Sequence, residues 1–111
     1  MTATFRVLLE MDVTPAHAAE FEATWSEIAD SVAANPANQG QALMRSCEHP
    51  CRYHVLSDWT DEAAFRSFER SAEHVRHRAR LAPYRGSVAM TTVRIVAQLP
   101  ARADNTHERM S

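Results

Sequence analysis

The strongest constraint on the fold is an alternating pattern at residues 4–13. One side of this stretch carries only apolar side chains, those of Phe5, Val7, Leu9, Met11 and Val13. The other side is mixed and carries Arg6, Leu8, Glu10 and Asp12. A period of two residues is typical of a β-strand that packs one face against other elements. The chain is therefore expected to build a sheet with one buried face.

A helix is expected directly after this strand. Thr14 followed by Pro15 is a typical helix start. Apolar residues then recur at spacings of three and four, at Ala18, Phe21, Trp25, Ile28 and Val32. The pattern stops at Asn35 and Pro36, because proline cannot continue the backbone hydrogen bonds of a helix. One face of this helix is expected to be buried.

Three more strands are predicted, at residues 41–46, 52–59 and 87–99. The first two are joined by a turn at residues 48–50 and are therefore expected to pair antiparallel. The third alternates like the first strand of the chain.

Helical segments are expected between the third and fourth strands. Thr60, Asp61 and Glu62 place a capping residue and two carboxylates at a helix start. The pattern restarts near Ser71 and ends at Pro83, which predicts a break followed by a further helical turn or two.

The resulting order, β-α-β-β-α-β, predicts an α+β protein of the ferredoxin-like, split βαβ plan. Its four antiparallel strands would carry the helices on one face. The other face is expected to carry apolar and charged residues together, namely Leu8 and Leu56 with Arg6, His54, Asp58 and Arg94. Such a face is too apolar for water, so a face-to-face homodimer forming an α+β barrel is expected.

Length and composition exclude several classes of protein. The chain has 111 residues and a formal net charge of −2, which predicts one domain at residues 1–99 and a polar, disordered tail at 100–111. No apolar run approaches the ~18 to 20 residues of a membrane span. The first residues contain no export signal, so a cytoplasmic protein is expected. Two glycines and no lysine exclude glycine-rich nucleotide loops and Schiff-base chemistry.

Metal sites are incomplete in the sequence. Cys47, His49 and Cys51 put three donors in one turn without a fourth ligand. His74 and His77 share a helix face but lack the nearby carboxylate typical of zinc helices. We therefore expect no metal site, and a role for the two cysteines stays open.

Arginines concentrate in the second half of the chain, at positions 66, 70, 76, 78, 80 and 85. A solvated helix face and a site for an anionic substrate or an acidic carrier protein both remain open. Nucleic acid is not expected as a partner, because the net charge is negative and no strand interleaves aromatic and basic residues.

The aromatic and methionine side chains suggest a ligand slot. Those expected between helices and sheet are Phe21, Trp25, Met44, Tyr53, Trp59, Phe65, Phe68 and Met90. They can form a plain core or line a flat slot for a polycyclic aromatic molecule, which stacks on rings and tolerates methionine walls. Both interpretations stay open from composition alone.

Several segments carry a family resemblance: residues 5–11, the Ala-Asn-Pro-Ala-Asn-Gln-Gly-Gln run at 34–41, Val-Leu-Ser-Asp-Trp-Thr-Asp-Glu at 55–62, residues 65–69, and His-Val-Arg-His-Arg at 74–78. Over residues 4–99 the chain resembles the small antibiotic biosynthesis monooxygenases, and among them the anthrone oxygenases of tetracenomycin-type aromatic polyketide pathways. Other members have an asparagine four residues before the strand tryptophan, where this chain has Val55.

The resemblance implies a dimer that oxidises a polycyclic anthrone or phenol to a quinone with O2, without metal, flavin or other cofactor. Such chemistry requires a base whose pKa is about 7, a cation or hydrogen-bond donor at the developing phenolate, and an aromatic slot that excludes water. His74 and His54 are the candidate bases. Arg45 and Asn38 are candidate partners of the phenolate, and Trp59 is expected to hold the ring system.

Two alternative functions remain open from the sequence. A polyketide cyclase could use the same fold for acid–base steps, and a non-catalytic dimer could bind aromatic ligands unaltered. Consumption of O2 with the substrate distinguishes an oxygenase from a cyclase.

Overall fold

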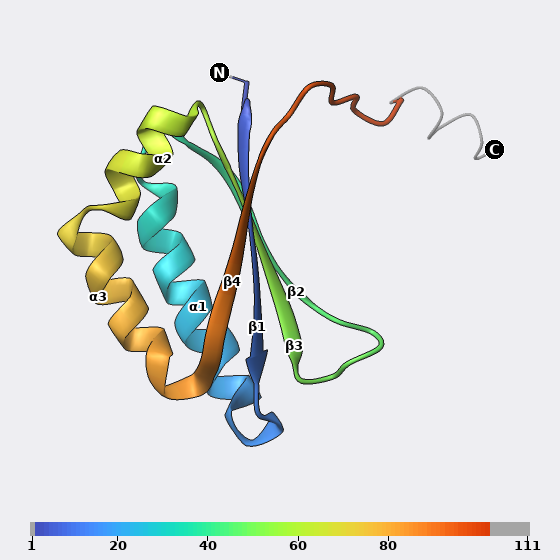
Figure 1. Cartoon of the computed structure of the whole chain (residues 1–111), viewed down its shortest axis with the longest axis vertical. Helices are drawn as coiled ribbons and strands as arrows, with labels where there is room; N and C mark the ends of the chain where they lie inside the picture. The colour runs from blue at the N-terminus through green and yellow to red at the C-terminus, as the bar shows by residue number, and fades with distance from the viewer. Residues whose placement is uncertain (1, 103–111) are drawn as a thin grey trace.

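The structure is a computed structural model that describes residues 2–102. Its elements are β1 (Phe5–Val13), α1 (Ala18–Ala33), β2 (Asn38–Arg45), β3 (Arg52–Trp59), α2 (Glu62–Glu69), α3 (Ala72–Leu81) and β4 (Arg85–Arg94). The described strands form one antiparallel sheet in the order β2-β3-β1-β4. All three helices lie on one side of this sheet (Figure 1). The ferredoxin-like α+β prediction is therefore confirmed.

Strand β1 lies between β3 and β4 and sets the two faces of the sheet. Leu9 is opposite Val55 of β3 and Met90 of β4, and Leu8 is opposite Leu56. Directly opposed residues of an antiparallel pair project to the same face. The predicted apolar side of β1 faces the helices, where Phe5, Val7, Met11 and Val13 are buried and Leu9 is half-buried.

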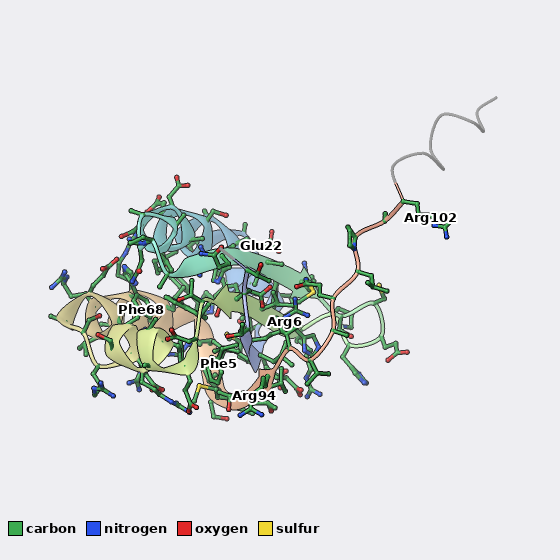
Figure 2. The ribbon with its side chains drawn as sticks, turned by 90° about the horizontal axis from the view of Figure 1, so that it is seen from above. Phe5, Arg6, Glu22, Phe68, Arg94 and Arg102 are labelled. Carbon is green, nitrogen blue, oxygen red and sulfur yellow. The ribbon has the colours of Figure 1, made fainter. Side chains whose placement is uncertain are left out.

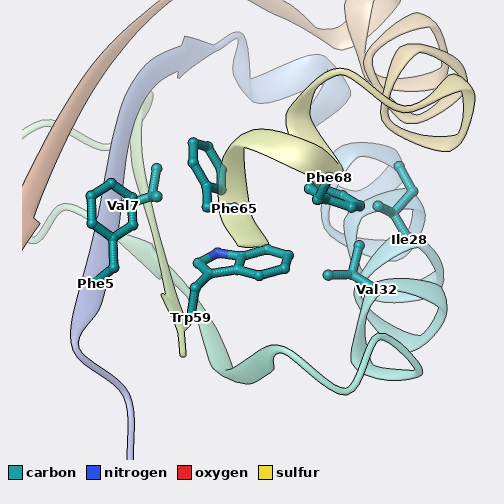
Figure 3. Close-up of a cluster of buried hydrophobic side chains, with 7 residues drawn as sticks. All are labelled: Phe5, Val7, Ile28, Val32, Trp59, Phe65 and Phe68. Atoms are coloured by element: carbon teal, nitrogen blue, oxygen red, sulfur yellow. The ribbon is translucent and has the colours of Figure 1, made fainter. Parts of the chain in front are cut away.

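The buried core on the helical side has an aromatic end. Figure 3 shows Trp59 among Phe65 and Phe68 of α2, Ile28 and Val32 of α1, and Phe5 and Val7 of β1. A second cluster at the other end of the sheet contains Met11, Val13, Phe21, Tyr53 and Val55. The space between helices and sheet is thus lined by apolar side chains along its length.

Two polar caps fix the helices that follow β3. The carboxylate of Asp61 accepts a hydrogen bond from the Ala64 N–H at 2.8 Å, which starts α2. The Ser71 hydroxyl accepts from the His74 N–H at 3.1 Å and donates to the Phe68 carbonyl at 2.6 Å. Ser71 therefore caps the start of α3 and holds the end of α2, at the break that the sequence predicted.

Several predicted boundaries differ from the structure. A short 3-10 turn, Pro15–His17, precedes α1, which begins at Ala18. Helix α3 has 10 residues, more than the predicted turn or two. Strand β4 ends at Arg94, short of the predicted residue 99, because Arg94 is opposite Phe5, the first residue of β1. Of the predicted disordered tail, residues 103–111 lie outside the described residues.

A bulge in β2 changes the face on which its later residues lie. Asn38 is opposite Trp59, but Gly40 is opposite Asp58, so Gln39 is an extra residue. Gly40 has a φ of 147°, which glycine adopts without a Cβ penalty. Because one added residue exchanges the two faces of a strand, Met44 lies opposite His54, on the face away from the helices. The expectation that Met44 lies between helices and sheet is wrong.

The face of the sheet without helices, called the open face below, carries Arg6, Leu8, His54, Leu56 and Asp58, as predicted. Arg94 does not belong to it, because Arg94 is opposite Phe5 on the helical side. Arg6 binds Asp58 at two points, Nε to Oδ1 at 2.7 Å and Nη2 to Oδ2 at 2.9 Å. Figure 2 shows Arg6 and Phe68 on opposite sides of the sheet. Within residues 2–102, no helix combines the length and the apolar composition needed to cross a bilayer.

Candidate active site

A cavity of about 440 Å³ lies between the sheet and the helices. Each helix and each strand of residues 2–102 contributes to its wall. Its volume falls in the range of small-molecule sites in proteins, about 300 to 1,000 Å³. Most of the wall is apolar, and the polar groups come mainly from α3 and the start of β4.

Aromatic rings form one end of the cavity. Trp59 packs against Phe68 with ring centroids 5.0 Å apart and edge-on against Phe65 at 5.6 Å. The indole Nε1 of Trp59 donates to the Ser57 hydroxyl at 3.0 Å. This N–H is already satisfied, so Trp59 offers the cavity an apolar ring surface. Trp25 of α1 adds a second indole to the wall.

His74 lines the cavity from the first turn of α3. Its ring lies edge-on to Phe68, with centroids 5.1 Å apart and an angle of 61° between the planes. Burial lowers the pKa of His74 below the ordinary 6.5, and the charge of Arg78 lowers it further. The nearby Glu69 carboxylate acts in the opposite direction. His74 is therefore mostly neutral at pH 7 and can accept a proton.

His77 lies in the same wall, one turn further along α3. Its Nε2 lies 3.7 Å from Oε2 of Glu73, and that same oxygen accepts a hydrogen bond from the Ser31 hydroxyl of α1 at 2.8 Å. Nδ1 of His77 is buried and has no hydrogen-bond partner within the described chain. Burial is the main cause that lowers the pKa of His77.

Two arginines add positive charge to the cavity wall. Arg78 follows His74 by one helical turn, and Arg85 begins β4. Within the part of the chain that the structure describes, neither has a carboxylate oxygen within 4.0 Å. Burial lowers the pKa of Arg85, and the charge of Arg78 adds to this effect. Two like charges without an acidic partner favour an anion beside them.

The structure brings together about half of the residues predicted for the site. His74 and Trp59 line the cavity with the predicted substrate-binding residues Trp25, Phe65, Phe68 and Met90. Phe21 and Tyr53 are fully buried in the second core cluster and do not line the cavity. His54 and Met44 lie on the open face.

The two predicted phenolate partners also lie outside the cavity wall. Arg45 is exposed, donates to the Pro50 carbonyl at 2.7 Å and lies over the ring of Tyr53. Asn38 donates to the Asp58 carbonyl at 3.3 Å in the bulged part of β2. In this structure both side chains are engaged in local contacts of β2 and β3.

Sequence reasoning did not single out His77, Arg78 and Arg85 as one group. A signal existed, because residues 74, 77 and 78 are spaced by three and four and so share a helix face. Arg85 is separated from them by the turn Ala82–Tyr84, so only the path of the chain into β4 brings it to the same wall. Val55, which stands where other members carry an asparagine, also lines the cavity.

Metal-binding side chains do not gather here. Within residues 2–102, no three histidine, cysteine, aspartate or glutamate side chains lie close enough to hold one ion. Cys47 and Cys51 are free thiols at the exposed turn between β2 and β3.

The fold and the cavity together define a class of small α+β proteins with an aromatic-lined cavity between helices and sheet. The chain belongs to the antibiotic biosynthesis monooxygenase family, whose family model matches residues 4–80. A solved structure from Caulobacter crescentus CB15, described under the same family name, is 25% identical with a TM-score of 0.78. It aligns over 86% of this chain and 92% of its own length.

Two Streptomyces proteins are also similar. The structure of SnoaB, a cofactor-independent oxygenase from Streptomyces nogalater, is 22% identical with a TM-score of 0.77, over 89% of this chain and 99% of SnoaB. Protein SchA of Streptomyces halstedii is 31% identical over 86 residues, which is 77% of this chain and 23% of SchA. The chain thus spans less than a quarter of that curated relative.

Proposed function

We propose that this protein is a cofactor-independent monooxygenase that oxidises a polycyclic anthrone or phenol to a quinone with O2. The observation that carries the proposal is the half-buried imidazole of His74 in an aromatic cavity that also holds two arginines without acidic partners in the described chain, where burial lowers the pKa of His74. Membership of the family and the fold shared with SnoaB, itself a cofactor-independent oxygenase, support the same reaction class.

The proposed reaction balances without a further reductant. Anthrone and one O2 give one quinone and one H2O. A base removes a proton from the benzylic CH2, and the resulting carbanion is delocalised into a phenolate. This electron-rich anion reduces O2 and forms a C–O bond to it, giving a hydroperoxide after protonation. Loss of the remaining C–H proton and of hydroxide, as water, leaves the new carbonyl.

The side chains of the cavity have distinct parts in this scheme. His74 takes the benzylic proton and returns it to the peroxide oxygen. Arg78 and Arg85 stabilise the phenolate, and their effect is strengthened because the apolar wall excludes water. Trp59, Phe65 and Phe68 present ring surfaces against which a planar substrate stacks.

Oxygen uptake tests the proposal directly. Purified protein is mixed with an anthrone while O2 and quinone absorbance are recorded together. We expect one O2 consumed per quinone formed, at a rate well above the spontaneous oxidation in buffer. Conversion that continues unchanged under strict anaerobiosis indicates a cyclase instead. A ligand that quenches tryptophan fluorescence and is recovered unaltered indicates a binding protein.

A further inference from the structure

His77 has an unusual pair of environments for its two ring nitrogens. Nε2 faces the carboxylate of Glu73 at 3.7 Å, whereas Nδ1 is buried without a partner in the described chain. Nδ1 is covered by neighbouring protein atoms in this structure, so a ligand group reaches it only when the imidazole, which lines the cavity, turns towards that group. Buried polar atoms in native proteins nearly always have a hydrogen-bond partner.

The Glu73 carboxylate, 3.7 Å from Nε2, favours one tautomer of the neutral ring. Glu73 is held by the Ser31 hydroxyl at 2.8 Å, which ties α3 to α1 and fixes the carboxylate beside Nε2. A negative charge beside Nε2 favours the tautomer with the proton on Nε2. Nδ1 is then an acceptor, and what it lacks is a donor.

We propose that His77 recognises a hydroxyl group of the ligand in this cavity, with Nδ1 accepting a hydrogen bond from a phenolic O–H. The inference rests on the proposed function for the aromatic character of the ligand and adds which of its groups is recognised. Glu73 and Ser31 act as positioning residues, because they hold the imidazole in the accepting tautomer.

The surroundings of His77 agree with a phenol as its partner. Its ring lies 6.3 Å from that of Phe68, so an aromatic ligand stacked at that end of the cavity comes close to the imidazole. Arg78, the next residue in α3, adds positive charge that makes the O–H of a nearby phenol a stronger hydrogen-bond donor. A methyl ether has the same oxygen without a proton and leaves Nδ1 unpaired.

Binding of two matched probes tests the proposal without any oxidation. The probes are 2-hydroxyanthraquinone and 2-methoxyanthraquinone, both already at the quinone level. The chain's two tryptophans line the cavity and report binding by quenching. The pH is set so that the free hydroxy probe is un-ionised. We expect the wild-type protein to bind the hydroxy probe about tenfold more tightly, as one hydrogen bond to a buried acceptor provides.

Substitution of the imidazole identifies the acceptor. His77→Phe keeps the ring and removes both nitrogens, so the preference for the hydroxy probe is expected to fall to about twofold or less. His77→Asn places an amide oxygen near the position of Nδ1 and is expected to restore much of the preference. His17→Phe, on the exposed 3-10 turn before α1, is the matched control and keeps it. Melting temperatures establish that each variant is folded.

Either of two results overturns the proposal. One is equal affinity of the wild-type protein for both probes, and the other is an undiminished preference in folded His77→Phe. Because the probes are not oxidised, these outcomes are independent of whether the protein consumes O2 with an anthrone.

Discussion

The imidazole of His74 lies edge-on against the phenyl ring of Phe68, with ring centroids 5.1 Å apart. Phe68 is also packed on Trp59 at 5.0 Å, so one ring separates the predicted base from the indole. This arrangement keeps the imidazole in apolar surroundings, which is the main cause of its lowered pKa. The predicted base, His74, and the indole of Trp59 are therefore both in contact with the ring of Phe68.

The first prediction distinguishes the two candidate bases. His74→Ala is expected to lower kcat by about two to four orders of magnitude, because the proton of the substrate loses its acceptor. His54 lies on the open face, outside the cavity, so His54→Ala is expected to stay within about threefold of the wild-type rate. Both rates are measured as quinone formation at saturating anthrone. The reverse pattern assigns the base to His54.

The second prediction concerns pH. In the proposed scheme the neutral form of His74 is the active one, and its pKa is lowered from the ordinary 6.5, so kcat/KM is expected to rise with pH along a limb whose midpoint is below 6.5. Arg78→Gln removes one cause of the lowering and is expected to move this midpoint to higher pH. The same variant loses a phenolate partner, and kcat falls about tenfold or more. A midpoint that stays in place shows that another group controls the limb.

The third prediction is that the rate survives removal of metals and flavins. The proposed scheme assigns every proton and electron to the substrate, O2 and side chains of this chain, so extensive dialysis against a chelator is expected to leave kcat unchanged. Metal content and flavin absorbance are measured on the same sample. Activity that disappears and returns only with added iron, copper or flavin contradicts the scheme.

The fourth prediction is a dimer through the open face. Met44 and Val93 are 40% and 37% exposed there, beside Leu8 and Leu56. At about 25 cal/mol per Å², an interface of about 1,600 Å² gives a gross gain well above the ~4 to 15 kcal/mol cost of association. Leu56→Glu places a carboxylate on this face in both copies, so dissociation is expected.

Sedimentation checks the fourth prediction at micromolar concentration. Ala63→Glu adds the same charge at an exposed position of α2, on the helical side, and is expected to remain dimeric. A wild-type chain that sediments at the monomer mass of 12.5 kDa contradicts the dimer.

Local sequence signals predicted much of the fold because local interactions decide those features. The two helix starts lie where the sequence predicted them, although the cap of α2 is Asp61 and not Thr60, one residue earlier, and Ser71 caps α3. The alternation at residues 4–13 predicted which side of β1 is buried, since an uninterrupted strand keeps its period of two. The end of β4 was not predictable in this way, because it depends on where its partner β1 begins.

The site was only partly predictable for the same reason. His74 and Phe68 were singled out from nearby segments, and the Ser71 cap brings those segments together. Met44 was placed on the wrong face, because the bulge at Gly40 depends on pairing with β3 and leaves no local periodicity to read. Arg85 lies in the same cavity wall as α3 because the turn Ala82–Tyr84 directs the chain there, and local sequence patterns do not reveal the path of that turn.

The hydroxyl of Ser71 ties the end of α2 to the start of α3, since it bonds to the backbone of both Phe68 and His74. The side chain does not line the cavity, so a substitution there is expected to shift the imidazole relative to the ring of Phe68 without altering the lining. Position 71 therefore offers a way to redirect which carbon of a bound ring system is presented to the base while the cavity lining stays the same. Libraries of variants that change only the residues lining the cavity do not include position 71, so they do not test this way of changing which carbon reacts.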